Sequence, residues 1–435
     1  MKYLFVIFCW LISQVLPAQK PVPAKWYEGR IQQQVAAVTE VMFNDVVNPP
    51  AAARFYAYTL LSGYALLSMS DQQLPQFQKE FKQFPVDSFK NASNYDISFA
   101  ALYAILETGK GILPSGMRLE EKQTQLLSDY KLVQSSKIII DSSLALAKRV
   151  AKSIIEYSRT DSYFKLSTKS RYRPGSKAGS WVPTPPEYMG AVEPNWNSIR
   201  PFFLDSCTQF KPLQETVFDS SKTSSFYSLA NEVYESVKNL SEEQTLIANF
   251  WDCNPFAVQF AGHMSVGLKK ISPGGHWLGI TGIVCTQQQF SFSKTLLLHT
   301  LVACSLHDAF ISCWDEKYRS NRVRPETAIN KYIDEKWKPL LQTPPFPEYT
   351  SGHSVVSTAV AELLTHYAGN EISFTDTTEM YIGLPSRKFS SFRSAADEAC
   401  ISRLYGGIHY RDAIENGKEQ GMRIAQFIIQ RVGIN

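Results

Sequence analysis

Residues 317–325 read KYRSNRVRP, residues 350–353 read TSGH and residues 402–409 read SRLYGGIH. The side chains in these blocks that can act on an anion are Lys317, Arg324, Arg403, His353 and His409. A lysine and two arginines can surround a tetrahedral oxyanion with charge-assisted hydrogen bonds. The two histidines can then supply a nucleophile or ligand and a proton carrier. The three blocks, in this order, predict one oxyanion site.

The first and third blocks are expected at helix ends. Arg324 precedes Pro325, and a residue before proline is biased away from helical dihedrals, so the helix that carries Lys317 should end near this point. A Gly-Gly pair at 406–407 permits a second break just before His409. Both blocks therefore present their side chains where a helix stops.

The second block is expected at a helix start. From Ser351 the segment SGHSVVSTAVAELLTHYA has the apolar spacing of an amphipathic helix. The first backbone N–H groups of a helix are unpaired and partly positive, so they can cradle an anion. Gly352 lets the backbone approach that anion closely, and Ser351 can add a hydroxyl contact.

The three blocks resemble the signature shared by the vanadium-dependent haloperoxidases and the acid phosphatases related to type-2 phosphatidic acid phosphatases. That signature reads Lys-x6-Arg-Pro, then Pro-Ser-Gly-His, then Ser-Arg-x5-His-x3-Asp, and the match spans residues 314–416. Thr350 stands where the signature has proline, and Ala413 stands where it has aspartate. The group that orients His409 is therefore expected to be Asp412, Glu415 or a backbone carbonyl.

The resemblance implies an all-α fold of helical bundles around the site. It also implies which residues bind vanadate or phosphate, namely Lys317, Arg324, Ser351, Gly352, Arg403 and His409. With vanadate, His409 is the implied vanadium ligand and His353 handles the protons of peroxide. With a phosphate ester, His409 is the implied nucleophile that forms a phosphohistidine, and His353 protonates the leaving alcohol.

Aromatic residues near these positions line a halide-side pocket in the superfamily. Trp314 and Phe346 are the matching residues here, with core packing as the alternative role. Asp315 and Glu348 also flank the blocks, and each either tunes proton transfer or pairs with a neighbouring arginine.

Three functions follow, in order of preference. The first is a vanadate-dependent haloperoxidase that oxidises iodide or bromide with hydrogen peroxide, because the chain has a long helical region ahead of the blocks and its motif segments look like those of secreted bacterial haloperoxidases. The second is an exported acid phosphatase that acts through a phosphohistidine. The third is a non-catalytic oxyanion binder, which the missing aspartate at 413 suggests.

Composition limits the partners and the location. The net charge of +4 on 435 residues is small and basic residues do not cluster outside the blocks, so nucleic acid is not expected as a partner. The apolar N-terminus predicts a signal peptide over residues 1–18 with cleavage near Ala18, with an uncleaved anchor as the alternative. We therefore expect an exported protein, periplasmic or secreted, without an integral membrane association after cleavage.

Periodicity divides the rest of the chain. The predicted parts are an N-terminal helical region at 19–170, a Pro/Gly-rich connecting segment at 171–215 and a C-terminal helical region with the site at 216–435. The apolar stretch around His307 and Asp308 is interpreted as a buried helix. SPGGHWLGI, at 272–280 and including GGHW, is expected as a glycine-rich break. The six cysteines after Cys9 show no disulfide framework, and buried free thiols or one bridge are the alternatives.

Overall fold

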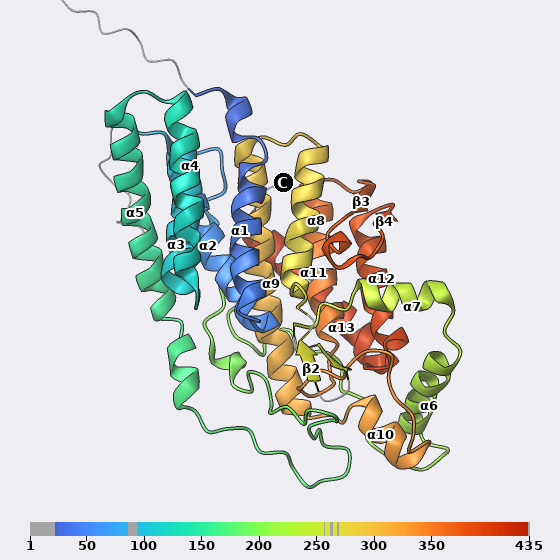
Figure 1. Ribbon diagram of the computed structural model, residues 1–435. Coiled ribbons are helices and arrows are strands. Elements are labelled where there is room, and N and C mark those ends of the chain that lie inside the picture. Colours follow the sequence, from blue (N-terminus) through green and yellow to red (C-terminus); the bar gives the residue numbers. More distant parts are fainter. Residues whose placement is uncertain (1–21, 86–93, 256, 262–263, 268, 434–435) are drawn as a thin grey trace, which may run out of the picture.

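The protein is mainly helical, as Figure 1 shows for the computed structural model. The structure describes residues 22–85, 94–255, 257–261, 264–267 and 269–433, so the predicted signal segment and Cys9 lie outside the described residues. Within those ranges, the longer elements are α1 (Arg30–Asn44), α2 (Pro49–Ser70), α3 (Ile97–Ile112), α4 (Leu119–Val133), α5 (Lys137–Arg159), α6 (Ser225–Lys238), α7 (Glu242–Phe250), α8 (Pro273–Gln287), α9 (Phe292–Ser320), α10 (Pro325–Tyr332), α11 (Gly352–Tyr367), α12 (Phe392–Tyr405) and α13 (Arg411–Val432). Two short antiparallel hairpins complete them, β1 (Val258–Ala261) with β2 (Met264–Gly267) and β3 (Phe374–Asp376) with β4 (Arg387–Phe389).

Helix α9 lies between two groups of helices. In Figure 1 the N-terminal helices α1 to α5 gather on one side of it and α11, α12 and α13 on the other. Helix α9 contacts α1 and α2 in the first group, α11 and α13 in the second, and also α8. Its residues from Thr295 to Lys317 are all buried, which confirms the prediction of a buried helix. Although α9 is long and apolar enough to cross a membrane, its most apolar window is entirely inside the protein.

Local signals set the helix boundaries. The Asn48 side chain accepts a hydrogen bond from the N–H of Ala51 at 2.9 Å, and Pro49 and Pro50 occupy the first positions of α2, where proline leaves no donor unused. Ser291 caps α9, which ends at Asn321 in the left-handed conformation. The expected break at GGHW is wrong: Ser272 caps α8, and the two glycines lie inside its first turn and are buried.

The predicted connecting segment is well packed. Residues 171–215 contain no α-helix, yet Trp181, Trp196 and Phe203 in this segment are buried. Asp308 of α9 holds the segment in place, because its carboxylate accepts the N–H groups of Phe202, Phe203 and Leu204 at 2.7–3.0 Å. The division of the chain at 170 and 215 itself stays a prediction.

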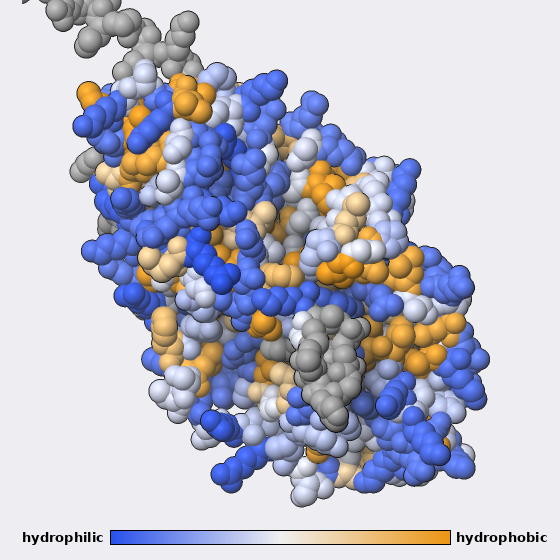
Figure 2. Space-filling model, viewed as in Figure 1, coloured by the Kyte–Doolittle hydropathy of each residue, from blue (hydrophilic) through white to orange (hydrophobic). Residues whose placement is uncertain are grey.

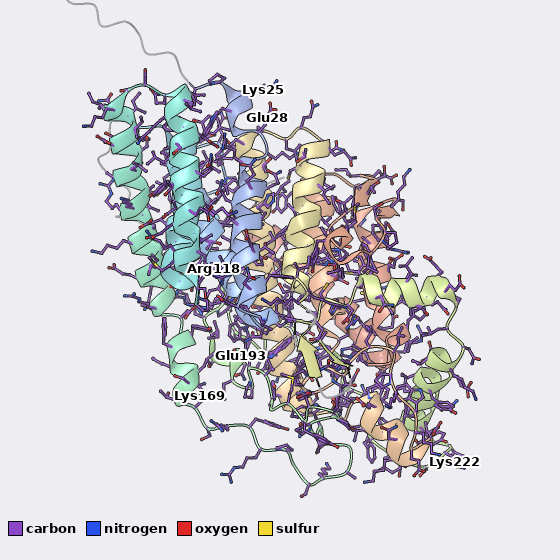
Figure 3. The ribbon with its side chains drawn as sticks, in the orientation of Figure 1. Lys25, Glu28, Arg118, Lys169, Glu193 and Lys222 are labelled. Carbon is purple, nitrogen blue, oxygen red and sulfur yellow. The ribbon has the colours of Figure 1, made fainter. Side chains whose placement is uncertain are left out.

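The visible surface of the protein is mainly hydrophilic (Figure 2). Figure 2 shows hydrophilic residues covering most of the visible face. The labelled Lys25, Lys169 and Lys222 in Figure 3 lie at distant points of the periphery, and all three are exposed. The cysteines from Cys207 onward are all free thiols, of which only Cys207 is not fully buried. Buried charge occurs in the Arg54–Asp161 ion pair, at Asp308 and in the region described next.

We expect Asp308→Ala to lower the free energy of unfolding by about 2–5 kcal/mol, because three buried backbone donors lose their acceptor. Denaturant unfolding monitored by circular dichroism measures the change. Asp397→Ala is the control, since Asp397 pairs with Lys418 at an exposed position and should change stability by at most about 1 kcal/mol. Equal effects of the two substitutions would contradict the role given to Asp308.

Candidate active site

The three sequence blocks meet at helix ends around a small cavity of about 40 Å³. Lys317 lies in the last turn of α9, Arg324 is the N-cap of α10 and Arg403 lies in the last turn of α12. The residues that line the cavity are Pro49, Cys253, Asn254, Pro255, Pro273, Phe310, Trp314, Pro344, Phe346, Gly352, His353, Arg403 and His409. Three predicted residues do not line the cavity but adjoin residues that do: Lys317 lies beside Phe346, Arg324 donates to His409, and Ser351 precedes Gly352.

His409 is held in one tautomer. It lies in the break between α12 and α13, where Gly407 takes a φ of +74° that favours glycine. Its Nδ1–H donates to Glu348 Oε1 at 2.7 Å, and Nη1 of Arg324 donates to its Nε2 at 3.2 Å. Burial and the nearby Arg324, Lys317 and Arg403 charges hold the pKa of His409 well below its ordinary value. The ring is therefore neutral, with the Nε2 lone pair toward the cationic side chains.

The expected orienting groups for His409 were wrong. Asp412 accepts hydrogen bonds from Nη1 of Arg322 at 2.9 Å and from the N–H of Thr216 at 3.1 Å, and Glu415 is paired with Lys418. Glu348 takes their place from 61 residues upstream, a distance at which no spacing rule links it to His409. Its position in PEYTSGH, beside the second block, was the one available signal.

Glu348 is a fully buried carboxylate with several partners. Oε1 also accepts the N–H of Tyr410 at 3.1 Å, and Oε2 lies 3.4 Å from Nη1 of Arg322. Burial raises the pKa of Glu348 to about 7, while the Arg322, Arg324 and Lys317 charges oppose the rise. Each of the two roles considered for Glu348 is thus matched by a contact, since Glu348 pairs with Arg322 and also with His409.

Two guanidinium groups have donors left over. Arg324 donates to the carbonyls of Phe346 and Ile408, and Arg403 donates to the carbonyl of Trp251 at 2.9 Å. Among the described residues, Nη2 of Arg324 and Nε of Arg403 are buried and find no hydrogen-bond acceptor. A buried donor without an acceptor is unfavourable, so these two N–H groups fit an anion in the cavity.

Lys317 is bound differently from the expectation. Its ammonium donates to the carbonyls of Pro347 and Glu348 at 3.3 and 3.1 Å and also to that of Thr350. Burial lowers its pKa to about 8. Three carbonyls occupy the three donors of the ammonium, so Lys317 contacts an anion only by leaving one of them.

The start of α11 supplies backbone donors, as the sequence indicated. Ser351 is the N-cap, and its Oγ accepts the N–H of Ser354 at 3.3 Å, which leaves the hydroxyl hydrogen free to donate. A side chain at Gly352 would lie between Trp314 and Lys317, at 3.6 and 3.9 Å. Glycine therefore keeps open the space in front of the N-terminal N–H groups of the helix.

His353 offers its free ring nitrogen to the cavity. Its other nitrogen is hydrogen-bonded to the carbonyl of Trp251, whereas Nε2 is buried without a partner among the described residues. Burial and the Arg403 charge hold its pKa well below the ordinary value, so the ring is neutral and Nε2 carries a lone pair. The carbonyl of Trp251 thus fixes both His353 and Arg403, a contact that the sequence gave no sign of.

Aromatic rings form the wall beside the cations. Trp314 and Phe346 both line the cavity with their ring centroids 4.9 Å apart. Nζ of Lys317 lies 5.2 Å from the centroid of Phe346, within the range of a cation–π contact. The position predicted for the halide side is therefore an apolar surface that touches the charged groups.

Known proteins that are similar to this chain are vanadium-dependent haloperoxidases. The family model described as the VCPO second helical-bundle domain matches residues 297–433. A crystal structure of a bacterial vanadium-dependent iodoperoxidase is 39% identical, with a TM-score of 0.87, and the alignment covers 95% of this chain and 98% of that one. The holo form of a bacterial vanadium-dependent chloroperoxidase shares the fold, with 15% identity, a TM-score of 0.62 and 95% of each chain covered. No curated protein sequence matches the chain.

The fold and the site thus define a haloperoxidase-type oxidoreductase of the all-α class. The chain belongs to the vanadium-dependent haloperoxidase family. Its own residues fit vanadate, because a neutral His409 presents Nε2 and because Arg324 and Arg403 keep buried donors without acceptors.

We expect Glu348→Ala to weaken vanadate binding by about 10–100-fold, because the ring of His409 loses the acceptor that sets its tautomer and orientation. Isothermal titration of the purified protein with orthovanadate measures the affinity. Glu348→Gln, which retains an acceptor oxygen, should lose less.

Asp412→Asn is the matched control for this titration, because Asp412 touches Arg322 and not His409. It should bind vanadate within about 3-fold of the unchanged protein if Glu348 is the orienting group. If Asp412→Asn weakened vanadate binding more than Glu348→Ala did, Glu348 would not be the orienting group.

Proposed function

We propose that this protein oxidises iodide or bromide with hydrogen peroxide, using vanadate bound in the cavity. The observation that carries the proposal is the pairing of a neutral, tautomer-fixed His409 with the unused donors of Arg324 and Arg403. The 39% identical relative is a vanadium-dependent iodoperoxidase, which favours iodide as the first halide to test.

The residues would divide the work as follows. Arg324, Arg403 and the first N–H groups of α11 hold the charge of the oxyanion, and His409 Nε2 supplies the ligand atom. Bound vanadate supplies Lewis-acid activation of peroxide. Lys317 can add its charge by exchanging one backbone carbonyl for the anion.

His353 is proposed as the proton carrier. Its Nε2 faces the cavity without a partner among the described residues, while the carbonyl of Trp251 fixes the ring. A neutral imidazole can accept a proton from peroxide and return it to the oxygen that leaves as water. Hydrogen peroxide and halide give hypohalous acid and water only with one further proton, which solvent supplies in each turnover.

We expect peroxide-dependent oxidation of iodide only after orthovanadate is added. His409→Ala should lower the rate by more than about 100-fold, because removing the proposed ligand should cost more than removing a residue that only orients it. Triiodide absorbance measures the rate with purified mature protein. His366→Ala, a histidine outside the cavity, is the control and should retain activity.

Hydrolysis of a phosphate ester by the vanadate-free protein is the alternative outcome. If no halide is oxidised with vanadate and ester hydrolysis depends on His409, the protein is an acid phosphatase that acts through a phosphohistidine. Tight vanadate or phosphate binding without either reaction would leave an oxyanion binder.

Halide choice is proposed to depend on Trp314 and Phe346. We expect Phe346→Leu to change the ratio of kcat/KM for bromide to that for iodide by about 2–5-fold, because the ring next to Lys317 is lost. Phe392→Leu replaces a buried ring outside the cavity lining and should leave the ratio unchanged. Steady-state rates with each halide measure both, and equal ratios in the two variants would remove Phe346 from the halide side.

We also propose export of the protein through an N-terminal signal cleaved near Ala18. N-terminal sequencing of the protein recovered from the periplasm or the medium tests this proposal, and an intact leader there would favour an uncleaved anchor.

A further inference from the structure

Three potential metal ligands lie together beside the catalytic cavity. They are Sγ of Cys253 in the loop after α7, Nδ1 of His276 in α8, and Oε1 of Glu379 in the segment after β3. All three residues are at most 2% exposed. Figure 1 shows α8 close to the β3–β4 hairpin, in agreement with the contacts between α8 and β3. We propose that these residues bind one divalent metal ion of the zinc type, in addition to vanadate.

The distances fit such an ion. Nδ1 of His276 lies 3.4 Å from Sγ of Cys253 and 3.4 Å from Oε1 of Glu379, and all three atoms lie within 4.8 Å of one another. Zinc bonds are about 2.3 Å to sulfur and about 2.0–2.2 Å to nitrogen and oxygen, which places donors about 3.3–3.7 Å apart on one tetrahedral ion. The three donors can therefore reach one ion with small movements of their side chains.

The surroundings prepare His276 as a ligand. Its Nε2 lies 2.7 Å from Oδ2 of Asp376, and Oδ1 of Asp376 accepts the N–H and the hydroxyl of Thr378 at 2.9 and 2.7 Å. Asp376 is thereby fixed as the acceptor of the Nε2 proton. Against the effect of burial, Asp376 and Cys253 raise the pKa of His276 well above its ordinary value, so a metal at Nδ1 would displace a proton. A carboxylate that holds the second nitrogen of a histidine ligand is the usual arrangement at zinc sites.

Glu379 indicates that a partner is missing. Its Oε1 is buried and has no hydrogen-bond partner among the described residues, although Nδ1 of His276 lies 3.4 Å away. The nearby Lys270 does not supply that partner, because its ammonium is paired with Asp252 at 2.6 Å. A divalent ion would satisfy Oε1 and would balance the charges of a thiolate and a carboxylate in one place.

The proposed metal would act on the catalytic cavity from outside it. Cys253 lines the cavity, and the ring of Trp251 stacks on His276 with centroids 4.5 Å apart and an interplanar angle of 14°. The carbonyl of Trp251 holds Arg403 and His353. An ion on Cys253 and His276 would thus fix the loop that positions two catalytic-site residues, which makes the three ligands positioning residues.

The test uses untagged full-length protein, treated with a chelator and then dialysed against Zn²⁺ or Co²⁺. We expect about one ion per chain by mass spectrometry of metals, and with Co²⁺ a near-ultraviolet thiolate-to-metal charge-transfer band. Cys253→Ser should lose that band, whereas Cys285→Ser, a buried cysteine of α8 outside the cluster, should retain it. Asp376→Asn should weaken Zn²⁺ binding by about 10–100-fold.

Thermal unfolding gives a second readout if Cys253→Ser does not fold. Zn²⁺ should raise the Tm of the unchanged protein, and Glu379→Gln should reduce this shift. Less than stoichiometric metal after dialysis, or equal loss in Cys253→Ser and Cys285→Ser, would overturn the proposal and leave a hydrogen-bonded Cys-His-Asp cluster. Because metal content is measured without peroxide or halide, either result is independent of haloperoxidase activity.

Discussion

The site depends on burying three cationic side chains next to a single carboxylate. Lys317, Arg324 and Arg403 are all buried at one cavity, and the carboxylate that reaches into this group is that of Glu348. Burying charge without a partner is costly, and backbone carbonyls offset it only in part. An oxyanion completes the balance, so the affinity of the site for such a ligand and the packing of four helix ends have the same physical origin.

Sequence reasoning predicted the parts of the fold that local rules control. The proline after Arg324, the glycines at 406–407 and the cap at Ser351 each placed a helix end where the structure has one. Periodicity likewise identified α9 as a buried helix. It failed at GGHW, because a pair of glycines is tolerated in the first turn of a helix when Ser272 caps that turn.

The residues predicted to bind the oxyanion lie in or beside one cavity, and their roles stay a prediction, whereas the groups behind them were missed. Residues with fixed spacing could be found, whereas the contact of Glu348 with His409 joins positions 61 residues apart. The carbonyl of Trp251 could not be predicted at all, because every residue type has a carbonyl group. The hydrogen bonds of Lys317 could not be predicted either, because their acceptors are three backbone oxygens whose positions follow only from the folded chain.

The hydrogen bond from Arg403 to the carbonyl of Trp251 ties the site to a part of the chain outside the signature blocks. The family match begins at residue 297, yet Trp251 lies before it in sequence. A C-terminal fragment, or the same motif grafted onto another helical scaffold, would carry the charged residues without the carbonyl that holds Arg403 and His353. The three signature blocks therefore do not make a complete site by themselves, because Arg403 and His353 also depend on the segment that contains Trp251. Divergence of that segment can change the enzyme while every signature residue is retained.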